Sequence, residues 1–214
     1  TPQEGNWLPM TPESSMLIVR QTFLDRAKER RAELTIARHP TAVAPKPLDP
    51  ATVATRLANA ARFVEGTARV FADWARDFAA QPNALPRQDQ QLYLAAGGDP
   101  TIHYYHGYYR LGPDDALVVE VPRIPPCESW NLQINNHWME SIDYRYHRAH
   151  VNKHTAVYAP DGRCTIVIAR RDPGCPNWLD TAGHAEGTLC FRWIGASEIV
   201  DPSARVVPLA SLVA

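Results

Sequence analysis

The hydrophobic periodicity of this chain changes once, close to Asp99. Between Pro50 and Ala80 the apolar residues recur every three or four positions, which is typical of one long amphipathic helix. Asp49 is placed to cap the first turn, and proline suits the first helical position. A second, short helix is predicted over residues 87–96, before a Gly-Gly pair.

After Asp99, β-branched and aromatic residues alternate with polar ones between Gly, Pro and Asp clusters. The strands predicted from this pattern are 102–111, 116–121, 129–136, 139–144, 155–158, 164–170 and 188–194, with the first two joined as a hairpin. Six or seven short antiparallel strands favour a sandwich. We therefore expect a fold that is mainly β with α: an antiparallel β-sandwich or jelly-roll-like domain with one long amphipathic helix.

An internal similarity bears on the first 26 residues. Asn6-Trp7-Leu8 is followed by Leu17-Ile18-Val19-Arg20, and near the other end Asn177-Trp178-Leu179 is followed by Leu189-Cys190-Phe191-Arg192. If the second copy is a loop that enters a closing strand, the first copy is one as well. Residues 1–26 are then the remnant of a preceding β domain. A chance match of a common tripeptide is the alternative.

The sequence is accordingly divided into three parts. Residues 1–48 are predicted as the closing loop and strands of a preceding β domain plus a Pro-rich connector, 49–98 as a helical segment, and 99–214 as the antiparallel β-sandwich domain. A remnant of this kind cannot bury its own apolar face. We therefore expect a partner that completes residues 1–26, either a missing N-terminal half or a partner subunit, and hence an oligomer.

Composition excludes several classes of protein. The 214 residues carry a net charge of -1, which gives no attraction to nucleic acid or to anionic membranes. No apolar run approaches the roughly 18 to 20 residues that cross a bilayer. We expect a cytoplasmic protein, although a chain that begins with Thr1 is either a processed product or a piece of something longer, so a removed signal stays open.

Motifs for common cofactors are absent from the sequence. The phosphate-binding patterns G-x-x-x-x-G-K-[ST] and G-x-G-x-x-G do not occur, nor do G-x-S-x-G and H-E-x-x-H, so no cofactor is expected. The four cysteines show no C-x-x-C spacing, which favours reduced thiols and leaves a Cys164–Cys190 bridge as a minor alternative.

The most informative polar segment is the long loop 171–187. It contains Asn177, Trp178, Asp180 and His184, a combination of amide, aromatic, acid and imidazole that suits a polar ligand. Asp180 and His184 are four residues apart, so in one helical turn the carboxylate would orient the imidazole. We predict both as catalytic, with Asn177 and Trp178 as substrate-binding residues. The alternative is that these side chains only plug and cap the loop.

Two strands supply the other candidates for substrate binding. Asn131, Gln133 and His137 share one face of the strand near Trp130, with Glu140 at the rim; an ordinary solvated face is the alternative. In His103–Arg110, the rings of Tyr105 and Tyr109 are predicted to stack on a ligand, and core packing is the alternative.

A third group of imidazoles carries no prediction of a metal site. His147, His150 and His154 would share one side of a helix, but they lie between predicted strands and among basic residues.

Several stretches resemble the bacterial family called domain of unknown function 1214: GDPTIHYYHGYYRL, ESWNLQINNHWMESIDYRYH and DPGCPNWLDTAGHAEGTLCFRW, together with segments of the first 75 residues. The resemblance implies a jelly-roll-like β domain, sometimes behind a second related domain, in proteins longer than this chain. It implies no catalytic residue, because no activity defines the family.

Three functions remain open. The first is an enzyme that acts on a polar or ring-containing small molecule by acid–base chemistry of His184 and Asp180. The second is a non-catalytic module that binds a small molecule or carbohydrate. The third is a structural subunit of a larger assembly.

Overall fold

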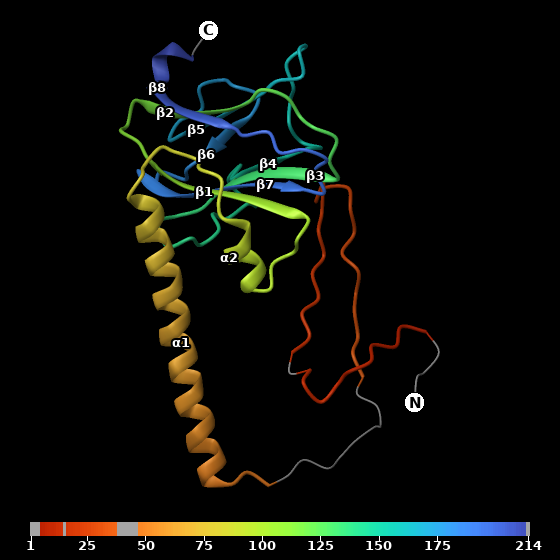
Figure 1. Cartoon of the computed structure of the whole chain (residues 1–214). Helices are drawn as coiled ribbons and strands as arrows, with labels where there is room; N and C mark the ends of the chain where they lie inside the picture. Colours follow the sequence, from red (N-terminus) through yellow and green to blue (C-terminus); the bar gives the residue numbers. More distant parts are fainter. Residues whose placement is uncertain (1–4, 15, 38–46, 213–214) are drawn as a thin grey trace. The chain divides into compact units, whose positions relative to one another are not determined.

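The regular structure of the chain consists mainly of one long helix and two four-stranded sheets (Figure 1). The structure is a computed structural model that describes residues 5–14, 16–37 and 47–212. The chain divides into two units, Thr1–Val43 and Ala44–Ala214. The second unit contains all the regular elements: α1 Pro50–Ala79, α2 Gln90–Ala95, β1 Ile102–Arg110, β2 Asp115–Val121, β3 Ser129–Ile134, β4 His150–Asn152, β5 Cys164–Ala169, β6 Trp178–Asp180, β7 Glu186–Ile194, β8 Ser203–Pro208 and a 3-10 turn, Leu209–Ser211.

The helices begin where the sequence predicts a cap or shortly after it. The Asp49 carboxylate accepts hydrogen bonds from the first backbone N–H groups of α1, as expected. Helix α2 is shorter than expected, because Arg87 instead forms a bridge with Tyr105 of β1 and Asp89 caps the helix. Among the described residues, no helix combines the length and the apolar character needed to span a membrane.

The two sheets enclose one hydrophobic core. One sheet has the order β1-β7-β3-β4 and the other β6-β5-β2-β8. Alternate residues of each strand point inward, as the burial of Trp130, Leu132 and Ile134 along β3 shows. The expected mainly β fold with one long helix is confirmed as a sandwich-like β domain.

Strand pairing corrects two details of the sequence prediction. Strands β1 and β2 do not form a hairpin: β1 pairs with β7, β2 pairs with β5 and β8, and the turn between them connects the two sheets. The β5–β6 pair is parallel, which differs from the all-antiparallel strands expected from the sequence.

The strands predicted on either side of residue 150 are also wrong. The segments 139–144 and 155–158 contain turns and coil apart from one isolated bridge, and β4 lies between them. In 155–158 the backbone is instead held by a side chain, since Asn177 accepts from and donates to Val157. Short edge segments of this kind have too few alternating residues to be recognised by periodicity.

The first unit contains no helix and no strand within residues 5–14 and 16–37. The expected closing strand at Leu17–Arg20 is therefore not formed there, and a second β domain is not seen. Two hydrogen bonds between the Gln21 side chain and the Ala32 backbone hold two extended segments together. Leu17, Ile18 and Val19 are all exposed, as is expected of an extended segment without a sheet to cover it.

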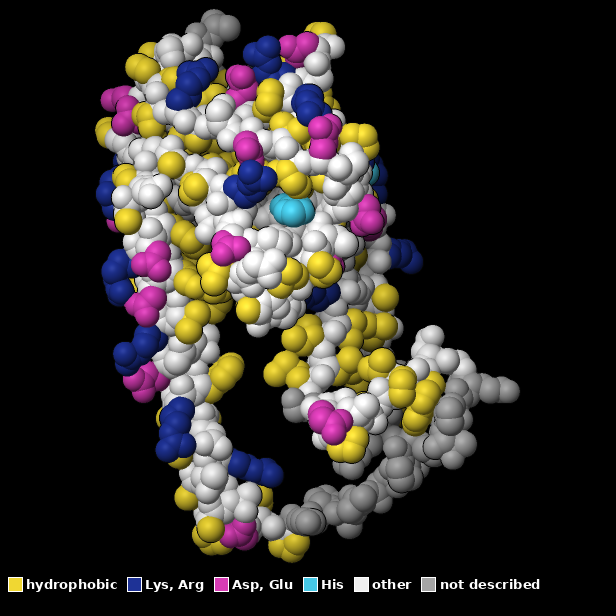
Figure 2. All heavy atoms as spheres, in the orientation of Figure 1, with side chains coloured by type: hydrophobic (Ala, Val, Ile, Leu, Met, Phe, Trp, Pro, Cys, Tyr) yellow, Lys and Arg dark blue, Asp and Glu magenta, His cyan; other side chains and the backbone are white. Residues whose placement is uncertain are grey.

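The surface of the second unit is mixed in charge. On the face shown in Figure 2, basic and acidic side chains are interspersed over α1 and the β domain, in keeping with the near-zero net charge. All four cysteines are free thiols. A Cys164–Cys190 bridge is therefore not formed; Cys164 begins β5 and Cys190 lies in β7, which belong to different sheets.

Candidate functional site

The outer face of sheet β1-β7-β3-β4 carries a row of polar and aromatic side chains. Tyr104 of β1 lies opposite Arg192 of β7, which in turn lies opposite Asn131 of β3. A second row lies two residues away on each strand and is formed in the same way by His106, Cys190 and Gln133. Since side chains alternate along a strand, both rows point away from the core that contains the neighbouring odd-numbered residues of β1.

The connection between α1 and α2 lies along the free edge of β1. Pro82 and Arg87 form bridges with Tyr108 and Tyr105. The approach is so close that a Cβ on Gly107 would stand 2.1 Å from the carbonyl oxygen of Ala84. Any larger residue at this position would displace the connection, which protects an edge strand that would otherwise be open.

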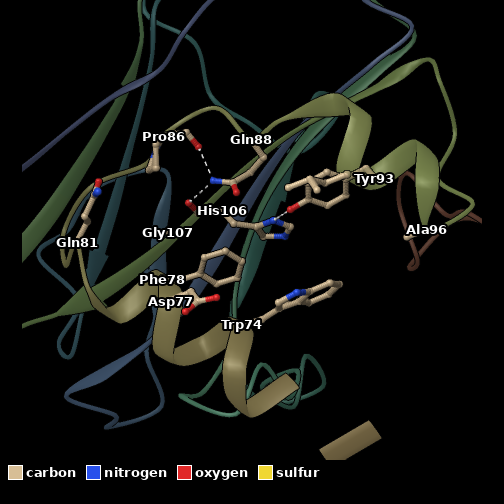
Figure 3. A pocket seen from close by; sticks show the side chains of 11 residues that line it. Trp74, Asp77, Phe78, Gln81, Pro86, Gln88, Tyr93, Ala96, His106 and Gly107 are labelled. Atoms are coloured by element: carbon tan, nitrogen blue, oxygen red, sulfur yellow. Dashed lines mark hydrogen bonds between the residues drawn. The ribbon is translucent and has the colours of Figure 1, made fainter. Parts of the chain in front are cut away.

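A cavity of about 310 Å³ lies between this connection, α1, α2 and the outer face of β1 (Figure 3). Its lining consists of Trp74, Asp77, Phe78, Gln81, Pro86, Gln88, Leu92, Tyr93, Ala96, His106 and Gly107. The volume falls at the lower end of the range for small-molecule sites, roughly 300–1,000 Å³.

Parallel rings form one wall of the cavity. The His106 ring stacks on Phe78, with centroids 5.0 Å apart and planes at 19°, and on Tyr93, at 5.6 Å and 22°. Tyr93 also stacks on Tyr104 at 4.4 Å. Figure 3 shows Phe78, His106 and Tyr93 following one another across the cavity, with Trp74, one turn from Phe78 on α1, below them. The rings of this wall stack on one another, and the exposed ring of Trp74 provides a face on which another ring can stack.

His106 and Tyr93 form a neutral polar pair inside this wall. The Tyr93 hydroxyl and His106 Nδ1 are joined by a hydrogen bond of 2.5 Å. Burial, with a smaller contribution from the positive charge of Arg192, lowers the pKa of His106 to about 4. Burial raises the pKa of Tyr93. Both groups therefore stay uncharged near pH 7, and they offer hydrogen bonds rather than acid–base chemistry.

Two of the predicted binding residues share the sheet face of the cavity without lining it. Asn131 and Gln133 accept hydrogen bonds from Arg192, at 3.2 and 3.3 Å. His137 is exposed and packs against Trp138, beyond the end of β3. Glu140 accepts a hydrogen bond from Asn136. The structure does not bring His137 and Glu140 together with the two amides of β3 around one of the described cavities.

The predicted tyrosines lie on the inner face of β1. Tyr105 and Tyr109 are buried, and their hydroxyls donate to the Asp201 carboxylate and to the Asn135 carbonyl oxygen. They occupy the core position that the sequence leaves as the alternative. The tyrosine of β1 that joins the ring stack is Tyr104.

Asn177 and Trp178 hold the 171–187 loop in place. Asn177 is buried and donates to the Thr165 carbonyl oxygen. The Trp178 ring N–H donates to the Ala169 carbonyl oxygen, and the ring packs against the second, smaller core cluster. These contacts match the plugging and capping alternative, and a substrate-binding role for either residue stays a prediction.

Asp180 is paired with a different histidine from the one expected. Its carboxylate accepts from His147 Nδ1 at 2.7 Å and from the Ala182 backbone N–H. Asp180 ends β6 and a turn follows, so the expected helical turn is not formed, and among the described residues no hydrogen bond joins it to the exposed His184. The segment around His147 is likewise not helical.

In the described part of the chain, no cluster of three or more His, Cys, Asp or Glu side chains is placed to hold a metal ion.

The residues that line the cavity were missed for two reasons. Trp74 and Phe78 belong to an apolar helical stripe, which predicts only packing against the domain. His106 belongs to the motif that was singled out, but the alternation of β1 does not say which face holds the core. The exposed ring of Trp74, 41% accessible, is the signal that only the structure provides.

The fold and the cavity together define an α-flanked β sandwich with a small-molecule-sized site on the outer face of one sheet. Residues 107–198 match the family model described as protein of unknown function (DUF1214). This stretch is therefore a DUF1214 domain, and the resemblance noted in the sequence is confirmed for it.

The solved structures that are similar to the chain include the following two. An uncharacterised protein from Burkholderia cenocepacia is 50% identical over 99% of this chain, with a TM-score of 0.90. The present chain spans 59% of the length of that protein. The VPA0106 protein from Vibrio parahaemolyticus is 21% identical over 54% of this chain and 33% of its own, with a TM-score of 0.41. No curated protein matches the chain.

Proposed function

We propose that the protein binds a flat, ring-containing small molecule in the cavity between α1, α2 and β1. The observation that carries this proposal is the wall of parallel rings at Phe78, His106 and Tyr93, which lines one cavity together with the exposed ring of Trp74. A ring inserted there stacks on Trp74 and covers its exposed face. This is the non-catalytic binding module among the functions that the sequence leaves open, at a different place in the domain.

Ligand-observed NMR with a library of flat heteroaromatic fragments tests the proposal. Trp74→Ala removes one wall of the cavity without disturbing the core, so the affinity of each hit is expected to fall roughly tenfold. Trp138→Ala is the matched control, because Trp138 is another exposed tryptophan and lines a different cavity, with Phe71 and Glu140; a fragment that loses affinity only in this variant binds there instead. An absence of hits, or hits that ignore Trp74→Ala, would contradict the proposal.

A second candidate function is acid–base chemistry near the 171–187 loop, as the sequence predicts. It is favoured by one contact, the hydrogen bond that lets the Asp180 carboxylate orient the His147 ring. In this mechanism Asp180 orients the catalytic base, and the base is either His184 or His147. A metabolite screen by thermal shift identifies compounds for turnover assays. Loss of turnover in His184→Ala or in His147→Ala, with an unchanged melting temperature, distinguishes the two histidines.

We also propose that residues 1–26 are completed by a further part of a larger protein or by a partner subunit. The exposed Leu17, Ile18 and Val19 support this, as does the greater length of the Burkholderia protein. Limited proteolysis of a longer natural form is the test: protection of Arg20 there, against cleavage in the present chain, is the expected result. Equal cleavage in both would contradict it.

A further inference from the structure

The charged groups around the cavity are unevenly distributed. Among its lining residues only Asp77 carries a formal charge, and neither Lys nor Arg is present. Figure 3 shows the Asp77 side chain beside Phe78 and Trp74. Within the described residues no ion pair engages the Asp77 carboxylate, and the basic neighbour on the same helix, Arg76, is paired with Asp73 at 2.6 Å. The cavity therefore has an unneutralised negative group beside its aromatic walls.

The positive charge that acts on His106 is held outside the cavity. The Arg192 guanidinium lies over the Tyr104 ring, 5.7 Å from its centroid, and it donates to Asn131 and Gln133 on the sheet. Tyr104 does not line the cavity and stacks behind Tyr93. Arg192 is thus bound to the sheet by three groups, and it is not available to pair with a ligand anion.

We propose that the cavity is a site for an organic cation, a ring that carries an ammonium group. This inference rests on the proposed function, since the ring of such a compound lies against the wall of parallel rings. Its ammonium group lies beside Asp77 and over the exposed face of Trp74. Tryptophan is the best aromatic partner for a cation, and a carboxylate at the same place adds direct charge attraction. The neutral His106–Tyr93 pair places no positive charge in the way.

Three single-ring probes of different charge test the inference: benzyltrimethylammonium, benzyl alcohol and benzoate. Their affinities are measured by NMR titration of the whole chain at low salt. The ammonium probe is expected to bind roughly tenfold more tightly than the alcohol, and benzoate more weakly than either. Asp77→Asn is expected to lower the affinity for the ammonium probe to about that for the alcohol while leaving the alcohol unaffected. Glu65→Gln, an exposed carboxylate farther along α1 that does not line the cavity, is the matched control and changes neither.

The outcomes separate this inference from the function on which it rests. Equal binding of the alcohol and the ammonium probe overturns the choice of a cation and leaves the ring-binding cavity in place. Ammonium binding that is unchanged by Asp77→Asn but lost in Glu65→Gln overturns the location of the charge. If no probe and no heteroaromatic fragment binds, the proposed function itself fails, and the inference fails with it.

Discussion

The two faces of sheet β1-β7-β3-β4 use aromatic rings in different ways. On the inner face, Phe191 meets Tyr105 and Trp193 edge-on, with interplanar angles of 82° and 79°. On the outer side, His106 and Tyr93 are near parallel, at 22°. The core also holds one near-parallel pair, Phe191 with Trp130 at 21°. What separates the two faces is therefore cover: the core rings are fully enclosed, whereas Trp74 beside the outer stack is 41% exposed. The same residue types thus build a close-packed core on one side and a cavity wall on the other.

The largest expected effect comes from comparing two neighbours on β3. Leu132 is fully buried on the inner face, and Gln133 lies on the outer face. We expect Leu132→Ala to lower the free energy of unfolding by about 3 kcal/mol, because it leaves a cavity in the core. Gln133→Ala is its control and is expected to cost about 1 kcal/mol, since it removes hydrogen bonds to Arg192 and Asn135. Urea denaturation measures both. Similar losses would mean that the two faces are equally packed.

A smaller effect is the pH dependence of the free energy of unfolding, which arises from His106 on the outer face of β1. The pKa of His106 is about 4 in the folded protein, below the usual value of 6.5. Between these values the unfolded chain binds a proton that the folded protein does not, so stability falls as the pH is lowered. From pH 7 to pH 4.5 this group accounts for about 2 kcal/mol. His106→Gln removes that contribution, and its free energy of unfolding is expected to change less over this interval. Parallel pH profiles for the two proteins would show that His106 is not buried in its neutral form.

How far the sequence predicts this molecule follows from the same comparison. Periodicity is sufficient for α1 and for the long strands, because these elements repeat their pattern over many residues. It does not identify the inner face of β1, where Tyr105 to Tyr109 are all buried, since one set of side chains faces the core and the other faces α1 and α2. Tyr105 and Tyr109 were predicted to bind the ligand, but both side chains face the core.

The pairing of Asp180 with His147 lies beyond local pattern altogether. The two residues are 33 positions apart, and their contact depends on how β6 and the turn before β4 are placed by the rest of the fold. The cavity has the same character, because its walls come from two helices, a connection and a strand. Spacing within one segment reports contacts along a helix or a strand, and it does not report contacts that the tertiary fold creates.

The smallest expected effect concerns the glycine that lets the connection cross β1. A methyl group on Gly107 would meet the Ala84 carbonyl, so Gly107→Ala must displace the segment that carries Pro86 and Gln88 of the cavity. Because the clash is with a backbone carbonyl and not with a flexible side chain, the segment must move as a whole, and we expect a loss of roughly 1–2 kcal/mol in the free energy of unfolding. Gly66→Ala in α1 is the matched control: nothing lies within 4 Å of its added Cβ, and alanine favours a helix, so a gain of up to about 1 kcal/mol is expected. If Gly107→Ala also reduces fragment binding while Gly66→Ala does not, the outer face depends on this crossing for its cavity. Unchanged stability and unchanged binding would show that the connection is not held against β1 in solution.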